Sequence, residues 1–124
     1  MAYAIYMGIP EMASLWNDLQ QKHRNHTAGK TEEALFEKWG KALKLVSENP
    51  RHPGLHSHDI PPLSERYGKK VWESYLENRN SDAFRMFWVY GPGRMQITVI
   101  GLDPHPEDKK NGAYDRISLS ELPM

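Results

Sequence analysis

The stretch Ala83-Phe84-Arg85-Met86-Phe87-Trp88-Val89-Tyr90 is apolar at nearly every position. Such a run is typical of a central strand that is covered on both faces of its sheet. The turn Gly91-Pro92-Gly93 follows, and a second apolar run over residues 95–102 completes a predicted β-hairpin. Arg85 is the one charged residue of the first run. Because burial of an unpaired guanidinium is costly, Arg85 must either have a partner or face a cleft.

The pairing of the two strands predicts how their side chains divide between the sheet faces. A four-residue connection over residues 90–93 sets Arg85 opposite Thr98 and Phe87 opposite Gln96. One face then carries only apolar side chains: Phe84, Met86, Trp88, Met95, Ile97 and Val99. The other face carries a polar patch of Arg85, Thr98 and Gln96 at the middle of the sheet. A structural ion pair of Arg85 with Glu73 or Asp82 is an equally open interpretation.

Two amphipathic helices are predicted before the hairpin, after a short strand over residues 2–7. Pro10 and Glu11 suit the start of the first helix, and residues 22–30 read as a polar loop. Thr31 is the expected N-cap of the second helix, which ends at Asn49-Pro50. The residues with helical spacing are Met12, Leu15, Trp16 and Leu19 in the first helix and Phe36, Trp39, Leu43 and Val46 in the second. These stripes are interpreted as core, the alternative being a groove for a partner.

The remaining segments complete an expected α+β fold. Residues 50–70 contain four prolines and two glycines and predict an ordered but irregular connection. Residues 71–76 form a third strand candidate, and the tail after residue 103 is expected along an edge of the sheet. The sequence therefore predicts a single domain over residues 1–124, with two N-terminal helices packed on a twisted, mostly antiparallel sheet.

Composition limits the possible functions. The 124 residues include no cysteine, which excludes disulfides and thiolate metal sites and fits a cytoplasmic protein. No apolar run is long enough for a membrane span, and the first residues lack the basic leader of a secretory signal. Lys plus Arg and Asp plus Glu both number 16. Since phosphate binding usually comes with a basic surplus, any RNA contact must come from a local cluster.

The order of these elements, with an arginine in the central strand, resembles the RelE/ParE toxin superfamily. The resemblance spans roughly residues 10–116 and rests on Asn49-Pro50, Leu55, residues 71–75, 83–88 and 97–102, Pro104-His105 and Tyr114. It implies a type II toxin–antitoxin toxin acting as an mRNA endoribonuclease (mRNA interferase) on the ribosome, held by a cognate antitoxin. A ParE-like or non-catalytic protein that acts through protein contacts is the alternative.

The resemblance also implies roles for particular residues. Arg85 would hold the scissile phosphate, His105 would assist proton transfer or bind the leaving group, and Tyr114 would orient or stack on the substrate. Metal-independent cleavage uses the 2′-OH as nucleophile and needs a base, a cation and an acid. Glu73 and Tyr75 are both candidates for the base, and Trp72, Tyr75 and Tyr114 for base stacking. No cofactor, metal or membrane contact is expected.

Other chemical motifs are weak. His52, His56 and His58, followed by Asp59, could bind zinc or nickel, but histidines in a proline-rich loop are more often surface residues or hydrogen-bond partners of carbonyl groups. The chain has no GxSxG nucleophile elbow, no phosphate-binding loop and no GxGxxG fingerprint.

Overall fold

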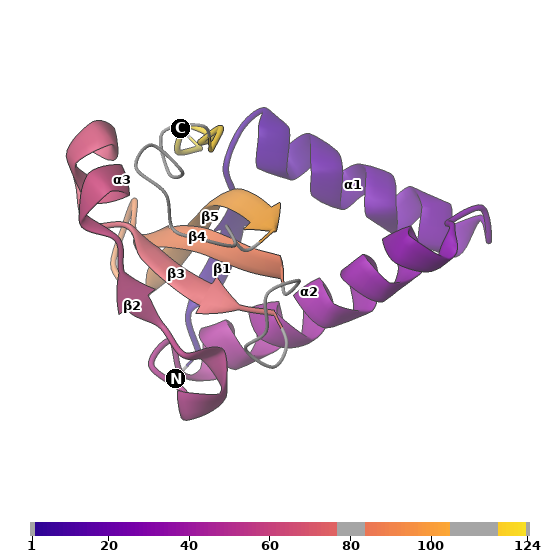
Figure 1. The fold of residues 1–124 in the computed structure, drawn as a ribbon, viewed down its shortest axis with the longest axis horizontal. Helices are drawn as coiled ribbons and strands as arrows, with labels where there is room; N and C mark the ends of the chain where they lie inside the picture. Colours follow the sequence, from indigo (N-terminus) through magenta and orange to yellow (C-terminus); the bar gives the residue numbers. More distant parts are fainter. Residues whose placement is uncertain (1, 77–83, 105–116, 124) are drawn as a thin grey trace.

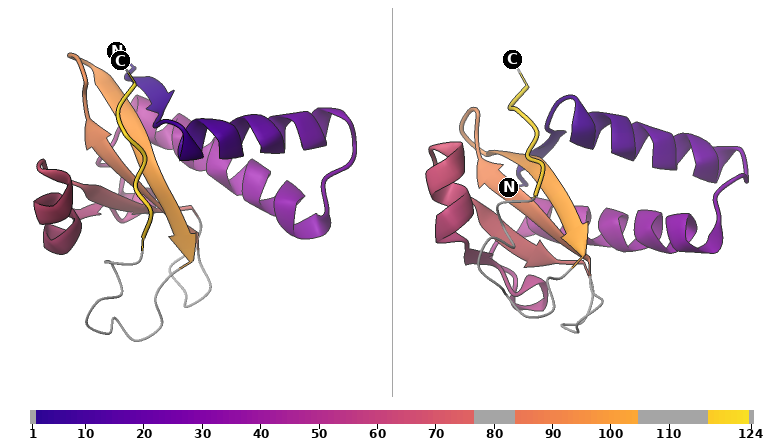
Figure 2. Two further views of the ribbon diagram at one scale, coloured as in Figure 1. Left: turned by 90° about the horizontal axis from the view of Figure 1, so that it is seen from above. Right: turned by 45° about the horizontal axis from the view of Figure 1, so that its top comes forward.

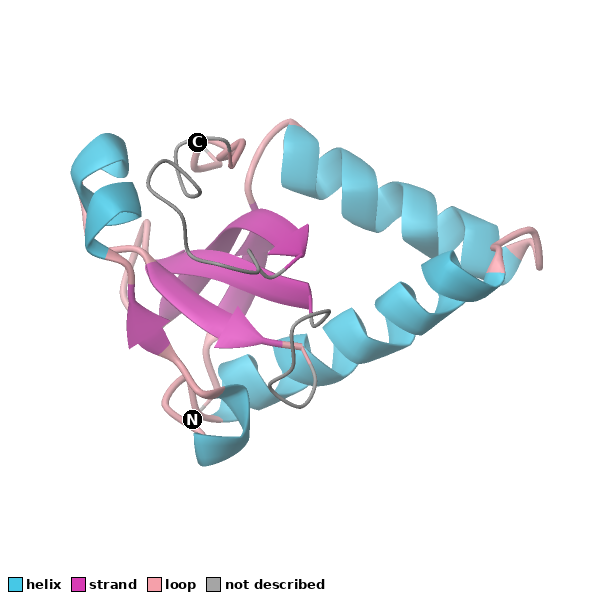
Figure 3. Cartoon of the chain, in the orientation of Figure 1, coloured by secondary structure: helices cyan, strands magenta, loops and turns pink. Residues whose placement is uncertain are grey.

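The α+β class is confirmed by the computed structural model, which describes residues 2–76, 84–104 and 117–123. The elements in these ranges are β1 (Ala4–Met7), α1 (Glu11–Arg24), α2 (Lys30–Glu48), the 3-10 turn η1 (Pro53–Leu55), β2 (His58–Asp59), α3 (Pro61–Tyr67), β3 (Trp72–Tyr75), β4 (Phe84–Tyr90) and β5 (Gln96–Pro104). The strands form one mixed sheet in the order β1-β5-β4-β3-β2, in which β1 runs parallel to β5 and the other pairs are antiparallel. Helices lie on both sides of this sheet (Figure 3).

The two predicted N-terminal helices are α1 and α2, which form a long antiparallel hairpin on one side of the sheet (Figure 1). Helix α1 continues to Arg24 and so includes the first three residues of the expected loop over residues 22–30. The predicted N-cap at Thr31 is wrong, because α2 begins at Lys30 and Gly29 is the N-cap. The Glu32 carboxylate accepts a hydrogen bond from the Gly29 N–H at 3.0 Å, which fixes the start of the helix there. No helix in the described ranges is long and apolar enough to cross a membrane.

The helix side of the sheet carries the larger hydrophobic core. Trp39 and Val46 of α2 are fully buried against it, whereas Phe36 and Leu43 are partly buried. This arrangement confirms that the helical stripes are core. The sheet residues of this cluster include Trp72, Met86, Trp88, Ile97 and Val99.

The β4–β5 register differs from the predicted one, although most side chains of the two strands lie on the predicted face of the sheet. Tyr90 pairs with Ile97, and Val89 with Thr98, and the five residues 91–95 separate the ends of the two strands. The shift of four residues from the predicted pairing is even, so it keeps side chains on their faces. A bulge between Phe87 and Trp88 then sets Arg85 opposite Asp103 instead of Thr98. Arg85, Thr98 and Gln96 therefore do not form a central polar patch.

The second face of the sheet is covered by α3 and the C-terminal residues 117–123 (Figure 2). The prediction of an irregular connection over residues 50–70 is wrong for residues 61–67, because they form α3. Pro61 and Pro62 occupy the first turn, where no backbone N–H is needed, and Gly68 ends the helix with φ of 83°. Residues of this second cluster are Ile60, Leu63, Val71, Phe87, Val89, Ile100 and Ile117.

The C-terminal segment contacts both strand β5 and Ile9, which follows the edge strand β1. The Ser120 N–H donates to the Ile100 carbonyl at 2.7 Å, and Glu121 forms an antiparallel bridge with Ile9. The segment packs closely against Gly8, the residue after β1. A Cβ atom at Gly8 would lie 2.5 Å from the Ser120 Cβ. The tail thus closes the second cluster over β5.

Substitution of Gly8 by alanine is expected to destabilise the protein by about 1–3 kcal/mol, the range for overpacking. The added methyl group would also lie 2.9 Å from the backbone oxygen of Val99, which cannot move without disturbing β5. Urea unfolding of Gly8→Ala beside the wild type measures the effect. A variant of unchanged stability would mean that the tail is not packed at Gly8.

Substitution of Gly40 by alanine is expected to do the opposite. Gly40 lies inside α2, where a Cβ would meet only Trp16 Cη2 at 4.0 Å, an ordinary contact. Because glycine in a helix interior costs about 0.5–1 kcal/mol relative to alanine, Gly40→Ala should gain that amount. The neighbouring exposed Lys41→Ala is the matched control, and a stability loss for Gly40→Ala alone would contradict the helix packing described here.

Candidate functional site

Arg85 lies on β4, at the face of the sheet away from α1 and α2. Its side chain is 1 % exposed, and its Nη1 atom contacts Oε2 of Glu73, which is 0 % exposed on the neighbouring strand β3. Of the two partners considered from the sequence, Glu73 is therefore confirmed, whereas Asp82 lies outside the described residues. Of the two possibilities for Arg85, a partner or a cleft, the structure shows a partner, and the guanidinium lies in a buried ion pair.

The other oxygen of Glu73 has a partner from the edge strand β2. His58 pairs in register with Glu73, and its Nε2 atom lies 2.8 Å from Glu73 Oε1. The Nδ1 atom of His58 lies 2.9 Å from the His56 carbonyl oxygen. The His58 side chain is 48 % exposed, so this cluster of Arg85, Glu73 and His58 extends from the interior to the surface. We refer to these three residues as the charged cluster.

The Tyr75 ring packs against the charged cluster. It pairs in register with Arg85, whose Cζ atom lies 5.5 Å from the centre of the Tyr75 ring, within the range of a cation–π contact. The His58 and His56 rings lie 6.4 Å and 6.0 Å from the same ring centre. A cation, a carboxylate and aromatic rings thus gather on one sheet face.

A second chain of hydrogen bonds holds the segment before His58 in place. Ser57 Oγ donates to the Pro50 carbonyl at 2.9 Å and shares a 2.6 Å hydrogen bond with Ser74 Oγ. Ser74 Oγ in turn accepts from Trp88 Nε1 at 2.8 Å. Because side chains alternate along a strand, Ser74 and Glu73 anchor Ser57 and His58 from opposite faces of β3.

Trp72 lies on the helix side, away from Arg85. Its ring stacks on Trp88 at 5.9 Å and 17°, and two exposed cations, Arg51 and Lys70, lie 4.6 and 5.4 Å from its centre. The structure therefore brings Glu73 and Tyr75 to Arg85 but separates Trp72 from them. His105 and Tyr114, the other two predicted catalytic residues, lie outside the described residues.

His58 is the residue that sequence reasoning missed. It was a metal candidate with His52, His56 and Asp59, whereas its Nδ1 atom contacts a backbone carbonyl group and its Nε2 atom contacts Glu73. The His52 Nδ1 atom accepts from the Gly54 N–H at 2.9 Å. Within the described ranges no three His, Cys, Asp or Glu side chains are grouped to hold a metal. Strand β2 has only two residues, too few for a periodic signal that would have revealed the partner of Glu73.

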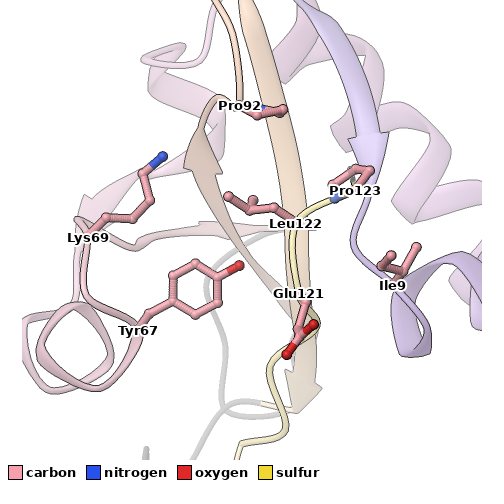
Figure 4. Close-up of a pocket in the computed structure, with 7 residues that line it drawn as sticks. All are labelled: Ile9, Tyr67, Lys69, Pro92, Glu121, Leu122 and Pro123. Carbon is pink, nitrogen blue, oxygen red and sulfur yellow. The ribbon is translucent and has the colours of Figure 1, made fainter.

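A pocket of about 520 Å³ lies elsewhere on the second face, between α3, the β4–β5 turn and the C-terminal segment (Figure 4). It is lined by Ile9, Tyr67, Lys69, Pro92, Glu121, Leu122 and Pro123. Tyr67 donates to the Ser120 carbonyl at 3.1 Å, and burial, with a smaller effect of the Glu121 charge, raises the pKa of Tyr67. Lys69 Nζ donates to the Tyr90 carbonyl at 2.7 Å. The pocket shares no residue with the charged cluster.

Comparison of the chain with protein-family models, curated proteins and solved structures finds no match. The function must therefore be inferred from the site itself and from the resemblance in the sequence.

Proposed function

We propose that this protein is a RelE-like toxin that cleaves messenger RNA without a metal ion, using the charged cluster and the predicted residues His105 and Tyr114. The observation that carries the proposal is the position of Arg85. It lies on the sheet face away from α1 and α2, beside a carboxylate and a tyrosine, with an exposed histidine at the surface. This combination supplies the types of group that RNA transesterification needs.

The reaction is the attack of a ribose 2′-OH on the adjacent phosphorus. The 2′-oxygen forms a bond to phosphorus while the bond to the 5′-oxygen breaks, which leaves a 2′,3′-cyclic phosphate and a 5′-OH. Arg85 suits the negative phosphorane, because a guanidinium donates two hydrogen bonds to phosphate oxygens. Glu73 takes the proton of the 2′-OH and His105 gives a proton to the 5′-oxygen.

Arg85 begins this reaction paired with Glu73. We infer that the phosphate replaces the carboxylate as the partner of Arg85, which frees Glu73 Oε2 to act as the base. Glu73 is the better of the two base candidates, because its carboxylate contacts the guanidinium directly, whereas the guanidinium lies 5.5 Å from the centre of the Tyr75 ring. The neutral charge balance of the chain favours the alternative of a protein that does not bind RNA, because phosphate binding usually comes with a basic surplus.

The resemblance extends the proposal to partners. A cognate antitoxin holds the protein inactive in the cytoplasm, and the ribosome presents the messenger RNA. The gene is expected to adjoin one for a small DNA-binding protein that is captured when the tagged toxin is pulled down from its host.

A second candidate is a ParE-like protein that acts by protein contact and cleaves nothing. One observation favours it: the Arg85–Glu73 pair is buried and has the geometry of a structural ion pair. Under this alternative the cluster stabilises the sheet, and toxicity arises from another surface.

Induced expression in a bacterium distinguishes the two candidates. Wild-type protein is expected to arrest growth and produce messenger cleavage, and Arg85→Ala should reduce cleavage by about 10²–10³, as does loss of one oxyanion donor. His105→Ala should cost about 10²–10⁴ as a lost proton-transfer group. Arg94→Ala, which removes an exposed arginine from the β4–β5 turn, is the matched control.

Three results of this experiment would count against the nuclease. Absence of arrest and cleavage with folded wild-type protein in the cell would refute it. Arrest without cleavage, or arrest that survives both substitutions, would favour the protein-contact alternative. Circular dichroism of each purified variant excludes unfolding as the cause.

A further inference from the structure

His58 is the member of the charged cluster that reaches the surface. Glu73 lies between two groups that can be cationic, with one carboxylate oxygen at His58 Nε2 and the other at Arg85 Nη1. Glu73 and Arg85 are buried, whereas nearly half of the His58 side chain is exposed. A change at His58 can therefore be transmitted to Arg85 through the Glu73 carboxylate that both residues contact.

The hydrogen-bond partners of His58 fix where its protons lie. The His56 carbonyl oxygen can only accept, so Nδ1 must carry a proton to bond with it. A hydrogen bond from Nε2 to the Glu73 carboxylate needs a second proton on the ring. Both contacts are satisfied together when His58 is an imidazolium and Glu73 is ionised. Since both ring nitrogens are then occupied, His58 acts through Glu73 and does not itself contact a substrate.

We propose that His58 is a positioning residue, which holds the Glu73 carboxylate by a charge-assisted hydrogen bond so that Arg85 can exchange Glu73 for a phosphate group of the RNA. The inference rests on the proposed function and adds a residue to it. Without His58, departure of Arg85 would cost the buried Glu73 carboxylate both of its contacts with His58 Nε2 and Arg85 Nη1, and loss of such contacts in the interior is unfavourable. When His58 is an imidazolium, Glu73 stays in contact with this cation while Arg85 binds the phosphate group.

The exchange should therefore depend on the contact between His58 and Glu73. Among the described residues, the His58 ring lies against Glu73 and Tyr75 of β3. Removal of the His58 side chain weakens the hold on Glu73 from β2, and Glu73 then retains Arg85. Anion binding at Arg85 is therefore weaker without the His58 side chain.

The experiment compares the wild type with His58→Ala, His58→Gln and the control His26→Asn. His26 lies in the distant α1–α2 loop at a positive φ of 58°, which asparagine tolerates well. The first probe is inorganic sulfate, a tetrahedral anion whose charge is constant between pH 6 and 8, followed by the NMR signal of the Arg85 side-chain N–H. The second is a short single-stranded RNA carrying 2′-O-methyl groups, which binds without being cleaved by this chemistry.

The wild type and His26→Asn should bind both probes about tenfold more tightly than His58→Ala. His58→Gln should lie between, because its amide donates a hydrogen bond to Glu73 but carries no charge. Thermal unfolding confirms that each variant is folded. If His58→Ala does not fold, the His58→Gln comparison decides.

Wild-type affinity of His58→Ala or of His58→Gln for both probes would overturn the inference. Cleavage of RNA by a His58→Ala protein at the wild-type rate would do so while leaving the nuclease intact. Binding of sulfate at Arg85 that depends on His58, in a protein that cleaves no RNA, would support the exchange and refute the proposed function.

Discussion

Substitution of Glu73 by alanine is expected to destabilise the protein by about 3–5 kcal/mol, the cost of breaking a buried ion pair from one side. The Arg85 guanidinium is 1 % exposed and would lose the carboxylate that contacts its Nη1 atom. His58 would lose the same partner, although its exposed side chain can be solvated by water. Urea unfolding followed by circular dichroism measures the change.

A double variant separates the lost charge balance from the lost side-chain volume. Glu73→Gln combined with Arg85→Met removes both charges and keeps chains of similar length, and the glutamine oxygen still accepts from His58. Replacement of a buried ion pair by uncharged groups often changes the free energy of unfolding little. The double variant should therefore unfold near the wild-type urea concentration. If Glu73→Ala lost less than about 1 kcal/mol, the pair would be exposed to water in solution.

Substitution of Trp88 by alanine is expected to cost about 3–5 kcal/mol, as for other large-to-small changes in a core. Trp88 is fully buried at the centre of β4, stacks on Trp72 and donates from Nε1 to Ser74 Oγ at 2.8 Å. Its loss leaves a cavity between the sheet and the helix hairpin, and Ser74 loses one of its two hydrogen-bond partners.

Trp16→Ala is the matched control, because Trp16 is only partly buried where α1 contacts Phe36 and Trp39 of α2. It should cost clearly less than Trp88→Ala. Trp88→Phe fills most of the space but lacks the N–H group, so it should lose about 0.5–1.5 kcal/mol, mainly from the lost hydrogen bond to Ser74 Oγ, which keeps its hydrogen bond with Ser57. Equal losses for Trp88→Ala and Trp16→Ala would contradict the central position of Trp88.

The sequence predicts the fold well where a periodic pattern spans many residues. Helices α1 and α2 and strands β4 and β5 have stripes or runs of seven or more residues that agree with their final burial. The prediction from sequence fails where the register of two strands depends on the turn between them. The five-residue connection and the bulge beside Phe87 changed the partner of Arg85, since neither leaves a hydrophobic pattern to follow. Helix α3 was missed because its two leading prolines indicate a loop as readily as a helix start.

The candidate site was predictable in part for the same reasons. Burial of an arginine requires a partner, and Glu73 on the next strand was one of two residues that could supply it. His58 could not be found, because its contact with Glu73 depends on a two-residue strand that follows an irregular segment. Trp72 and Glu73 are adjacent in sequence, so strand alternation sets them on opposite faces.

The chemistry of the cut ends of messenger RNA tests the central claim most directly. Purified wild-type protein is added to a translating bacterial extract, beside the Glu73→Gln/Arg85→Met variant that is expected to keep its fold. The wild type should produce messenger fragments with 2′,3′-cyclic phosphate and 5′-OH ends, at least about 10²-fold faster than the double variant. Intact messenger RNA, ends that carry a 5′-phosphate, or equal cutting by the two proteins would contradict an Arg85-dependent, metal-independent RNA nuclease.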